Sequence, residues 1–174
     1  MNPRIEMEPG PASWPQVRAL LAEVWPNATP APWGHVTWAQ GPARRIIVRD
    51  EARELACHVG LHLRDAEWDG RPVRIGGVGG VVTRAQQRRH GIATAAMKRA
   101  AREIEEVDKA DFALLFCEPH NFPFYTRLGW RRFEDDVLVE QPHGRVRFEV
   151  MAAFVLDLRL QPRTGAIDLC GPPW

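Results

Sequence analysis

One stretch of this sequence, two arginines followed by a histidine and small residues, has the residue types and spacing best suited to binding a ligand. Arg88-Arg89-His90-Gly91-Ile92-Ala93-Thr94 lies between an apolar run that ends at Thr83 and a segment with apolar residues at every third or fourth position. This arrangement predicts a strand, a cationic loop and a helix that begins at Gly91. A helix start exposes unpaired N–H groups and the positive end of the helix dipole, and small residues there admit a phosphate. The stretch therefore predicts a phosphate-binding loop; an ordinary strand-to-helix turn with surface arginines is the alternative.

The same loop resembles a known enzyme signature. Arg88-Arg89-His90-Gly91-Ile92-Ala93 matches the pattern R-x-x-G-x-G/A of the GNAT superfamily of N-acetyltransferases, with alanine in the last position. The resemblance implies that acetyl-CoA is the cofactor, without a metal, and that the loop binds its pyrophosphate. It also implies that the preceding main chain pairs with the pantetheine arm, as a strand edge can pair with an extended amide chain. The implied cofactor-binding residues are Val81, Val82, Thr83, Arg88, Arg89, His90, Gly91, Ile92, Ala93 and Thr94.

Acetyl transfer to an amine needs a donor for the oxyanion, an acid for the leaving thiolate and a base for the amine. By resemblance, the oxyanion donor would be a backbone N–H near Val81. Tyr125 is the only tyrosine in the chain, and Phe124-Tyr125-Thr126-Arg127-Leu128-Gly129-Trp130 matches the family's F/L-Y-x-x-x-G-W/F segment. In many relatives this tyrosine protonates the CoA sulfur, so Tyr125 is the predicted acid. The alternative is a core aromatic whose hydroxyl caps a backbone group.

The general base is not where the resemblance would place it. Many relatives carry a glutamate on the strand before the cofactor loop, and the aligned position here is Gly79. Glu118 and His120 are the predicted substitutes, because both follow a strand end, where α/β sheets usually bind ligands, and histidine has a suitable pKa. Alternatively, Glu118 attracts the substrate ammonium, His120 caps a short helix, or water relays the proton.

The C-terminal residues narrow the expected acceptor. Asp168-Leu169-Cys170-Gly171-Pro172-Pro173-Trp174 resembles the tail of aminoglycoside 2′-N-acetyltransferases, in which the terminal carboxylate and nearby acids reach the antibiotic. This resemblance implies that Asp168 and Trp174 bind the acceptor, and it implies a role in antibiotic resistance. The segment 27–41 would lie over the acceptor and contribute Trp33 and Trp38; a loop that only covers the core is the alternative.

That acceptor segment nevertheless contains no Asp or Glu. A polycationic antibiotic calls for carboxylates in its site, so the sequence favours an aminoglycoside with few amines, such as kasugamycin. Two alternatives remain open. One is a GNAT enzyme that acetylates another small amine or a protein amine, and the other is a non-catalytic module that binds acyl-CoA.

The elements that must position these residues predict a mixed α/β (α+β) fold. Apolar periodicity gives the order β-α-β-β-β-α-β-α-β-β, which predicts a mixed sheet with helices on its faces. The resemblance to the GNAT fold implies that the sheet is mostly antiparallel, with helices on both faces. The alternating strand 54–64 places His58 and His62 on one face, where we expect solvated or helix-packed side chains.

Four glycines at 76, 77, 79 and 80 predict a bulge or a close backbone approach. The predicted strands are 4–8, 44–49, 54–64, 73–83, 111–117, 130–139 and 146–158, and the predicted helices are 11–25, 91–107 and 122–128.

Length and composition set the remaining expectations. The 174 residues suit a single domain, with an N-terminal helix and acceptor loop (1–43), a core (44–158) and a tail near the acceptor site (159–174). A net charge of +1 gives no support for a nucleic-acid or membrane partner. The three cysteines, Cys57, Cys117 and Cys170, are odd in number and are not spaced in pairs. This pattern indicates reduced thiols, a cytoplasmic protein and no metal site. The expected partner is a small-molecule amine, and homodimerisation is left open.

Overall fold

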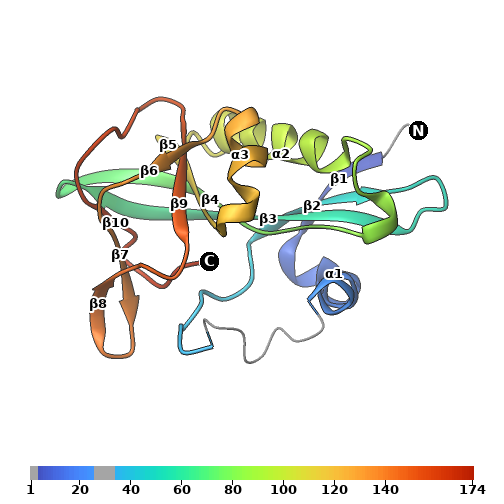
Figure 1. Ribbon diagram of the computed structural model, residues 1–174, viewed down its shortest axis with the longest axis horizontal. Helices are drawn as coiled ribbons and strands as arrows, with labels where there is room; N and C mark the ends of the chain where they lie inside the picture. The colour runs from blue at the N-terminus through green and yellow to red at the C-terminus, as the bar shows by residue number, and fades with distance from the viewer. Residues whose placement is uncertain (1–3, 26–33) are drawn as a thin grey trace.

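A ten-stranded mixed sheet forms the centre of the molecule in the computed structural model, which describes residues 4–25 and 34–174 (Figure 1). The strands follow one another across the sheet as β1, β2, β3, β4, β5, β9 and β6, and β10, β7 and β8 extend it from the far end of β3. Only β4 with β5 and β7 with β10 pair in parallel among the described strands, so the predicted mostly antiparallel sheet is confirmed. The bounds are β1 (Arg4–Pro9), β2 (Arg44–Arg49), β3 (Leu55–Trp68), β4 (Arg71–Thr83), β5 (Phe112–Cys117), β6 (Arg131–Phe133), β7 (Val137–Gln141), β8 (Gly144–Arg147), β9 (Ala152–Asp157) and β10 (Ile167–Asp168).

Helices cover both faces of this sheet, as predicted. Helix α1 (Gly10–Val24) lies on one face, and α2 (Ile92–Arg102) and α3 (Phe122–Arg127) lie on the other (Figure 1). Alternation along β2 explains the division, because successive side chains point to opposite faces. Ile47 packs with residues of α1, whereas Ile46 and Val48 pack with residues of α2.

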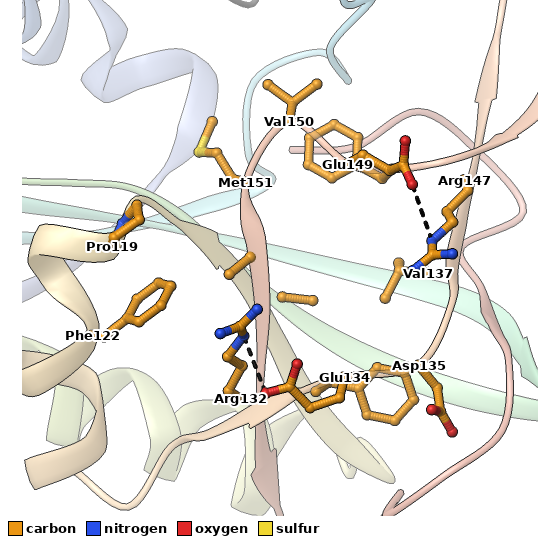
Figure 2. A pocket seen from close by; sticks show the side chains of 14 residues that line it. Pro119, Phe122, Arg132, Glu134, Asp135, Val137, Arg147, Glu149, Val150 and Met151 are labelled. Carbon is orange, nitrogen blue, oxygen red and sulfur yellow. Dashed lines mark ion pairs between the residues drawn. The ribbon is translucent and has the colours of Figure 1, made fainter.

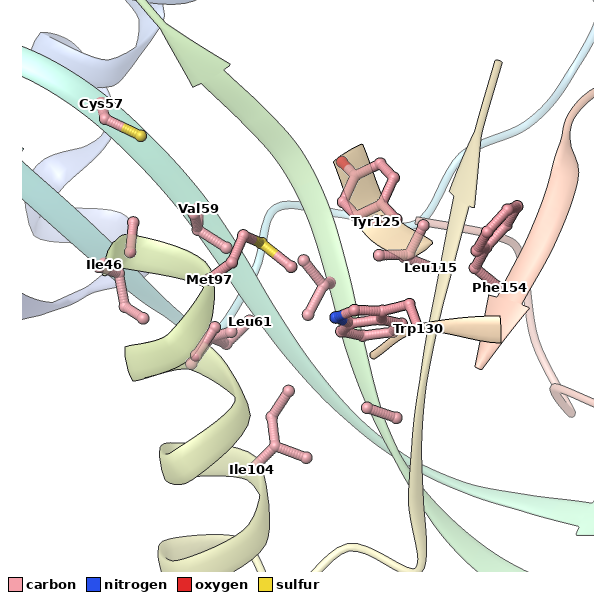
Figure 3. Packing of buried hydrophobic residues seen from close by; sticks show 14 of the residues in the cluster. Ile46, Cys57, Val59, Leu61, Met97, Ile104, Leu115, Tyr125, Trp130 and Phe154 are labelled. Carbon is pink, nitrogen blue, oxygen red and sulfur yellow. The ribbon is translucent and has the colours of Figure 1, made fainter. Parts of the chain in front are cut away.

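The core under α2 and α3 holds the end of the predicted cofactor loop, at the start of α2, against the sheet. Met97 and Ile104 lie fully buried against the strands, and Tyr125 of α3 lies across the same core near Trp130 (Figure 3). Burying such side chains contributes about 1.5–3 kcal/mol each, so the start of α2 is held against the sheet. In the described parts of the chain, no helix has the length and apolar character needed to cross a bilayer.

The predicted helix 91–107 is wrong at its C-terminal end. The α-helix ends at Arg102, and a π-helical turn, η2 (Glu103–Val107), follows it. A π turn adds one residue to a turn and so shifts the apolar face. Ile104 therefore stays fully buried, while Val107 is exposed and does not join the apolar stripe.

The predicted strands 130–139 and 146–158 are each divided in two. Strand β6 pairs with β9, whereas β7 pairs with β8 and β10, so the chain crosses between two parts of the sheet at Glu134–Asp136. The second interruption lies between β8 and β9, where Phe148 turns into the core. The tail adds β10, which had no periodicity to predict it. Two short 3₁₀ turns, η1 (Ala85–Gln87) and η3 (Pro119–Asn121), complete the described elements.

Candidate active site

A bulge in β4 opens the sheet next to the predicted cofactor loop. His58 of β3 lies opposite Val82, but Gly60 lies opposite Gly79, so β4 has one extra residue between these pairs. Gly80, within the bulge, has a φ of 58°, a conformation that favours glycine. The parallel pairing of β4 with β5 ends at Val78 and Leu115, so the part of β4 that carries the bulge extends beyond this pairing. This separation leaves one edge of β4 available to an extended amide chain.

The loop after β4 ends at the N-terminal end of α2. Gly91 caps the helix with a φ of 75°, and the first helical hydrogen bond runs from the Ala95 N–H to the Gly91 carbonyl, 3.0 Å. The N–H groups of Ile92, Ala93 and Thr94 precede that bond and point out of the helix end. The first turn contains no acidic residue. Arg88, Arg89 and His90 are exposed beside it, and Arg88 donates from Nε to the Thr83 carbonyl at 3.1 Å.

Tyr125 lies on the α3 side of the separated strands. Its side chain is buried among aromatic residues, with the Trp130 ring centroid 6.4 Å away and the Phe154 centroid 6.3 Å away. Burial, followed by the nearby Cys117 and Cys57, raises the pKa of Tyr125 above its usual value. The phenol therefore keeps its proton at neutral pH, as a general acid must.

An aromatic cluster lies on the opposite, α1-side face of β4, consisting of Trp38, His62, Phe116, Phe148 and Trp174. The Trp174 ring stacks on His62 with centroids 5.6 Å apart, and Phe116 lies 6.2 Å from Trp174 and 4.4 Å from Phe148. Trp38 meets Phe148 edge to face at 5.9 Å. Gly77 explains how close Trp174 comes to the strand, because a Cβ there would overlap the indole ring.

The predicted acceptor residues have different places relative to this cluster. Trp38 and Trp174 belong to it, and the Ala39 N–H donates to the Pro173 carbonyl at 2.6 Å, which joins their two segments. Trp33 lies outside the described residues. Asp168 does not reach the cluster, because its carboxylate accepts from Arg145 at 2.6 Å and from the Cys170 N–H at 2.9 Å. Its β3 partner is Glu67, five residues beyond His62, or roughly 17 Å along a strand.

The two predicted bases follow the end of β5. Glu118 has an extended backbone two residues after Phe116, so its side chain emerges on the face of the aromatic cluster. His120 lies in η3, and its Nδ1 is 3.9 Å from the Glu118 carboxylate. The His120 side chain is largely exposed, whereas the Glu118 side chain is 43% exposed.

Two histidines of β3 occupy the site in a way that the sequence did not indicate. A Cβ on Gly79 would be 3.7 Å from Nε2 of His62, so His62 lies beside the position where relatives carry glutamate. Burial, followed by Arg64 and Arg45, lowers the pKa of His62 to about 4. His58 is fully enclosed beside the bulge, with Nδ1 2.7 Å from the Gly80 carbonyl and Nε2 3.2 Å from the Arg45 guanidinium. Strand alternation predicted their shared face, but not that Trp174 would cover it.

A pocket of about 430 Å³ adjoins the cluster at Phe148 (Figure 2). Two ion pairs line it, Arg132 with Glu134 at 3.3 Å and Arg147 with Glu149 at 3.5 Å. Phe122 and Val137 add apolar surface. The pocket therefore offers charges of both signs, and Asp135 adds a third carboxylate to the two ion pairs.

One group of side chains in the described residues has metal-binding atoms close together. Glu67, Asp168 and Cys170 each have a ligand atom within 4.8 Å of the others. Asp168 is already bonded to Arg145, as described above, and the absence of a metal stays a prediction.

Comparison with known proteins gives one family. A sequence profile of the acetyltransferase (GNAT) domain matches residues 8–133. The fold is similar to that of Escherichia coli YhbS, a GNAT family N-acetyltransferase solved in complex with CoA, with a TM-score of 0.63 and 16% identity over 98% of this chain and 91% of that one. It is also similar to a GNAT family acetyltransferase from Brucella melitensis in complex with acetyl-CoA (TM-score 0.63, 11% identity, 95% and 94% of the chains) and to Escherichia coli ElaA (TM-score 0.61, 12% identity, 90% and 100%). No curated protein sequence matches the chain.

Proposed function

We propose that this chain, which belongs to the GNAT family of acetyltransferases, transfers the acetyl group of acetyl-CoA to an amine of a small molecule with few positive charges. The observation that carries the proposal is the separation of β4 from β5 beside the open N-terminal end of α2. A cofactor with an extended amide arm and a diphosphate needs these two features side by side. The complexes of two structural neighbours with CoA and acetyl-CoA support the same cofactor here.

The proposed cofactor site follows the chain from Val81 to Thr94. The N–H groups of Ile92, Ala93 and Thr94 would bind the pyrophosphate. Arg88 and Arg89 would add positive charge around it, and His90 would lie beside them. The main chain of Val81, Val82 and Thr83 would pair with the pantetheine arm. The thioester would then lie at the bulge, where a backbone N–H can bind the oxyanion of the tetrahedral intermediate.

The proposed proton transfers use one residue on each face of the separated strands. The amine nitrogen attacks the thioester carbonyl carbon, the C–S bond breaks, and the thiolate takes a proton from the Tyr125 hydroxyl. His62 is the first candidate to accept the ammonium proton, directly or through water, because it is neutral and lies beside the Gly79 position. Glu118 is the second candidate, with its carboxylate on the same face, and His120 is the third.

The acceptor that we propose is an aminoglycoside with few amines, such as kasugamycin, acetylated at its 2′-amine as part of antibiotic resistance. The described part of the acceptor segment, residues 34–41, has no Asp or Glu, and the Arg64 guanidinium lies 5.1 Å from the Trp174 ring centroid. Such surroundings disfavour a polycation. Trp38 and Trp174 would pack against the sugar rings, and the pocket at Phe148 would accept the far end of the molecule. Another small amine or a protein amine is the alternative acceptor.

A thiol-release assay with acetyl-CoA and a panel of amines tests the proposal. The panel contains kasugamycin, a polycationic aminoglycoside, simple primary amines and a lysine peptide. We expect thiol release with the first at a higher kcat/KM than with the others. Turnover with the peptide alone would replace the acceptor proposal, and cofactor binding without thiol release for any amine would favour a non-catalytic acyl-CoA module.

A further inference from the structure

The carbonyl of Gly80 is held by a histidine side chain across the bulge. His58 Nδ1 lies 2.7 Å from this oxygen, and a Cβ on Gly80 would come within 3.2 Å of the imidazole ring. The carbonyl of Gly80 and the N–H of Val81 belong to one planar trans peptide, so the two groups point in opposite directions. Because the carbonyl points toward His58, the Val81 N–H points away from His58. Val81 lies beyond the pairing of β4 with β5, which ends at Val78.

The other nitrogen of the same ring is held by an arginine. Arg45 NH1 lies 3.2 Å from Nε2 of His58, and a guanidinium can only donate hydrogen bonds. Nε2 must therefore accept, which leaves the proton on Nδ1, where it is donated to the Gly80 carbonyl. Arg45 is itself fixed, since it is 3% exposed, donates from Nε to the Gly10 carbonyl at 3.0 Å and lies 5.2 Å from the Trp14 ring centroid. Burial lowers the pKa of His58 to about 4, so the ring is neutral at physiological pH.

We propose that His58, kept in its Nδ1-protonated form by Arg45, is a positioning residue that orients the Gly80–Val81 peptide so that the Val81 N–H donates to the thioester carbonyl oxygen. This inference rests on the proposed acetyl transfer. Preorganised donors stabilise the oxyanion more than the ground state, so losing the orientation lowers kcat more than it raises KM.

Two amide substitutions separate this role from a merely structural one. The amide nitrogen of His58→Asn can occupy the place of Nδ1 and donate to Gly80, whereas the amide of His58→Gln occupies the place of Nε2 and leaves Gly80 without its donor. We expect the Asn variant to stay within about threefold of the wild-type kcat and the Gln variant to lose about 100-fold, both with unchanged affinity for acetyl-CoA by calorimetry. Equal losses of kcat in the two variants would overturn the inference.

The infrared stretch of carbon-13-labelled acetyl-CoA reports the hydrogen bond directly. For the wild type and the Asn variant, we expect the bound thioester carbonyl to absorb at a lower frequency than in water. For the Gln variant, we expect it to absorb at a higher frequency than in the wild type. A frequency unchanged among all three, with acetyl-CoA bound and amines still acetylated, would overturn the positioning role and leave the proposed function intact. A wild-type chain that does not bind acetyl-CoA would overturn both.

A measurement on the wild-type chain does not depend on the folding of any variant. In nitrogen-15 spectra of labelled histidine, His58 should show a protonated Nδ1 and an unprotonated Nε2 throughout neutral pH. The opposite tautomer, or a fast-exchanging mixture, would overturn the inference because Gly80 would then lack a fixed donor.

Discussion

The proposed cofactor side and the proposed acceptor side of this site are built in different ways. The residues proposed to bind acetyl-CoA come from one continuous stretch, Val81 to Thr94, which forms a strand end, a loop and a helix start. The aromatic cluster instead combines residues from the α1–β2 segment, β3, β5, the β8–β9 connection and the C-terminal tail. Apart from the Gly80–Val81 peptide, which is held by His58, a site made of local structure keeps its geometry when distant segments change. A site made of five segments depends on all of them. Substitutions on each side should therefore affect the two substrates separately.

The largest effect on turnover is expected for Tyr125, the proposed acid for the leaving thiolate. Tyr125→Phe keeps the ring in the core but removes the proton donor, so kcat should fall about 100-fold. The affinity for CoA, measured by calorimetry, should change less than twofold, because the loop and α2 are untouched. A kcat within a factor of two of the wild type would exclude Tyr125 as the acid.

His62→Phe is expected to lower kcat/KM by about tenfold or more, because the variant loses the ring nitrogen but can still stack on Trp174. Glu118→Gln and His120→Gln are the matched comparisons, and a larger loss in either would transfer the base role to that residue.

The pH dependence of kcat/KM tests the proposed role of His62 independently. The pKa of His62 is lowered to about 4 from 6.5, so the neutral base persists below pH 6.5 and is lost only as the pH falls toward 4. After correction for protonation of the acceptor amine, kcat/KM should have its acid inflection near this lower value. An inflection at 6.5 that disappears in His62→Phe would contradict the buried environment described for this side chain.

Trp174→Ala should raise the KM of the acceptor by roughly fivefold to tenfold and leave acetyl-CoA affinity within twofold, because the indole covers Gly77 on the acceptor face. Steady-state kinetics with each substrate varied separately measures the two effects. An unchanged acceptor KM would remove the tail from the site.

The smallest effect is expected from the exposed cation of the loop. Arg88→Gln should weaken acetyl-CoA binding by about threefold to fivefold at low ionic strength and by less at high salt, because exposed charges are screened. The KM of the acceptor should not change. A loss that affects the acceptor instead would break the division between the two sides.

The same contrast explains what the sequence could predict. Apolar periodicity and small residues after two arginines are local signals, and they located β4, the loop and the start of α2 correctly. The π turn after Arg102 left Val107 exposed because the helical period changes within a run that still has apolar residues. The interruptions at Glu134–Asp136 and before β9 arise from pairing with distant strands, which no local pattern encodes.

The acceptor side was predictable only in part, for the same reason. The resemblance predicts Trp38 and Trp174 as acceptor-binding residues, a role that stays a prediction, and the fold joins their two segments. His58 and His62 were recognised as sharing a face, but their environment depends on Arg45 from a neighbouring strand and Trp174 from the tail. Asp168 was expected at the acceptor, but its carboxylate is bonded to Arg145.

A crystal structure of the chain with acetyl-CoA bound tests the central claim most directly. We predict pyrophosphate oxygens within hydrogen-bonding distance of the N–H groups of Ile92, Ala93 and Thr94, and the thioester between β4 and β5 with its carbonyl oxygen on the Val81 N–H. Density for the cofactor elsewhere on the molecule, or none at a concentration that saturates other GNAT enzymes, would contradict the account.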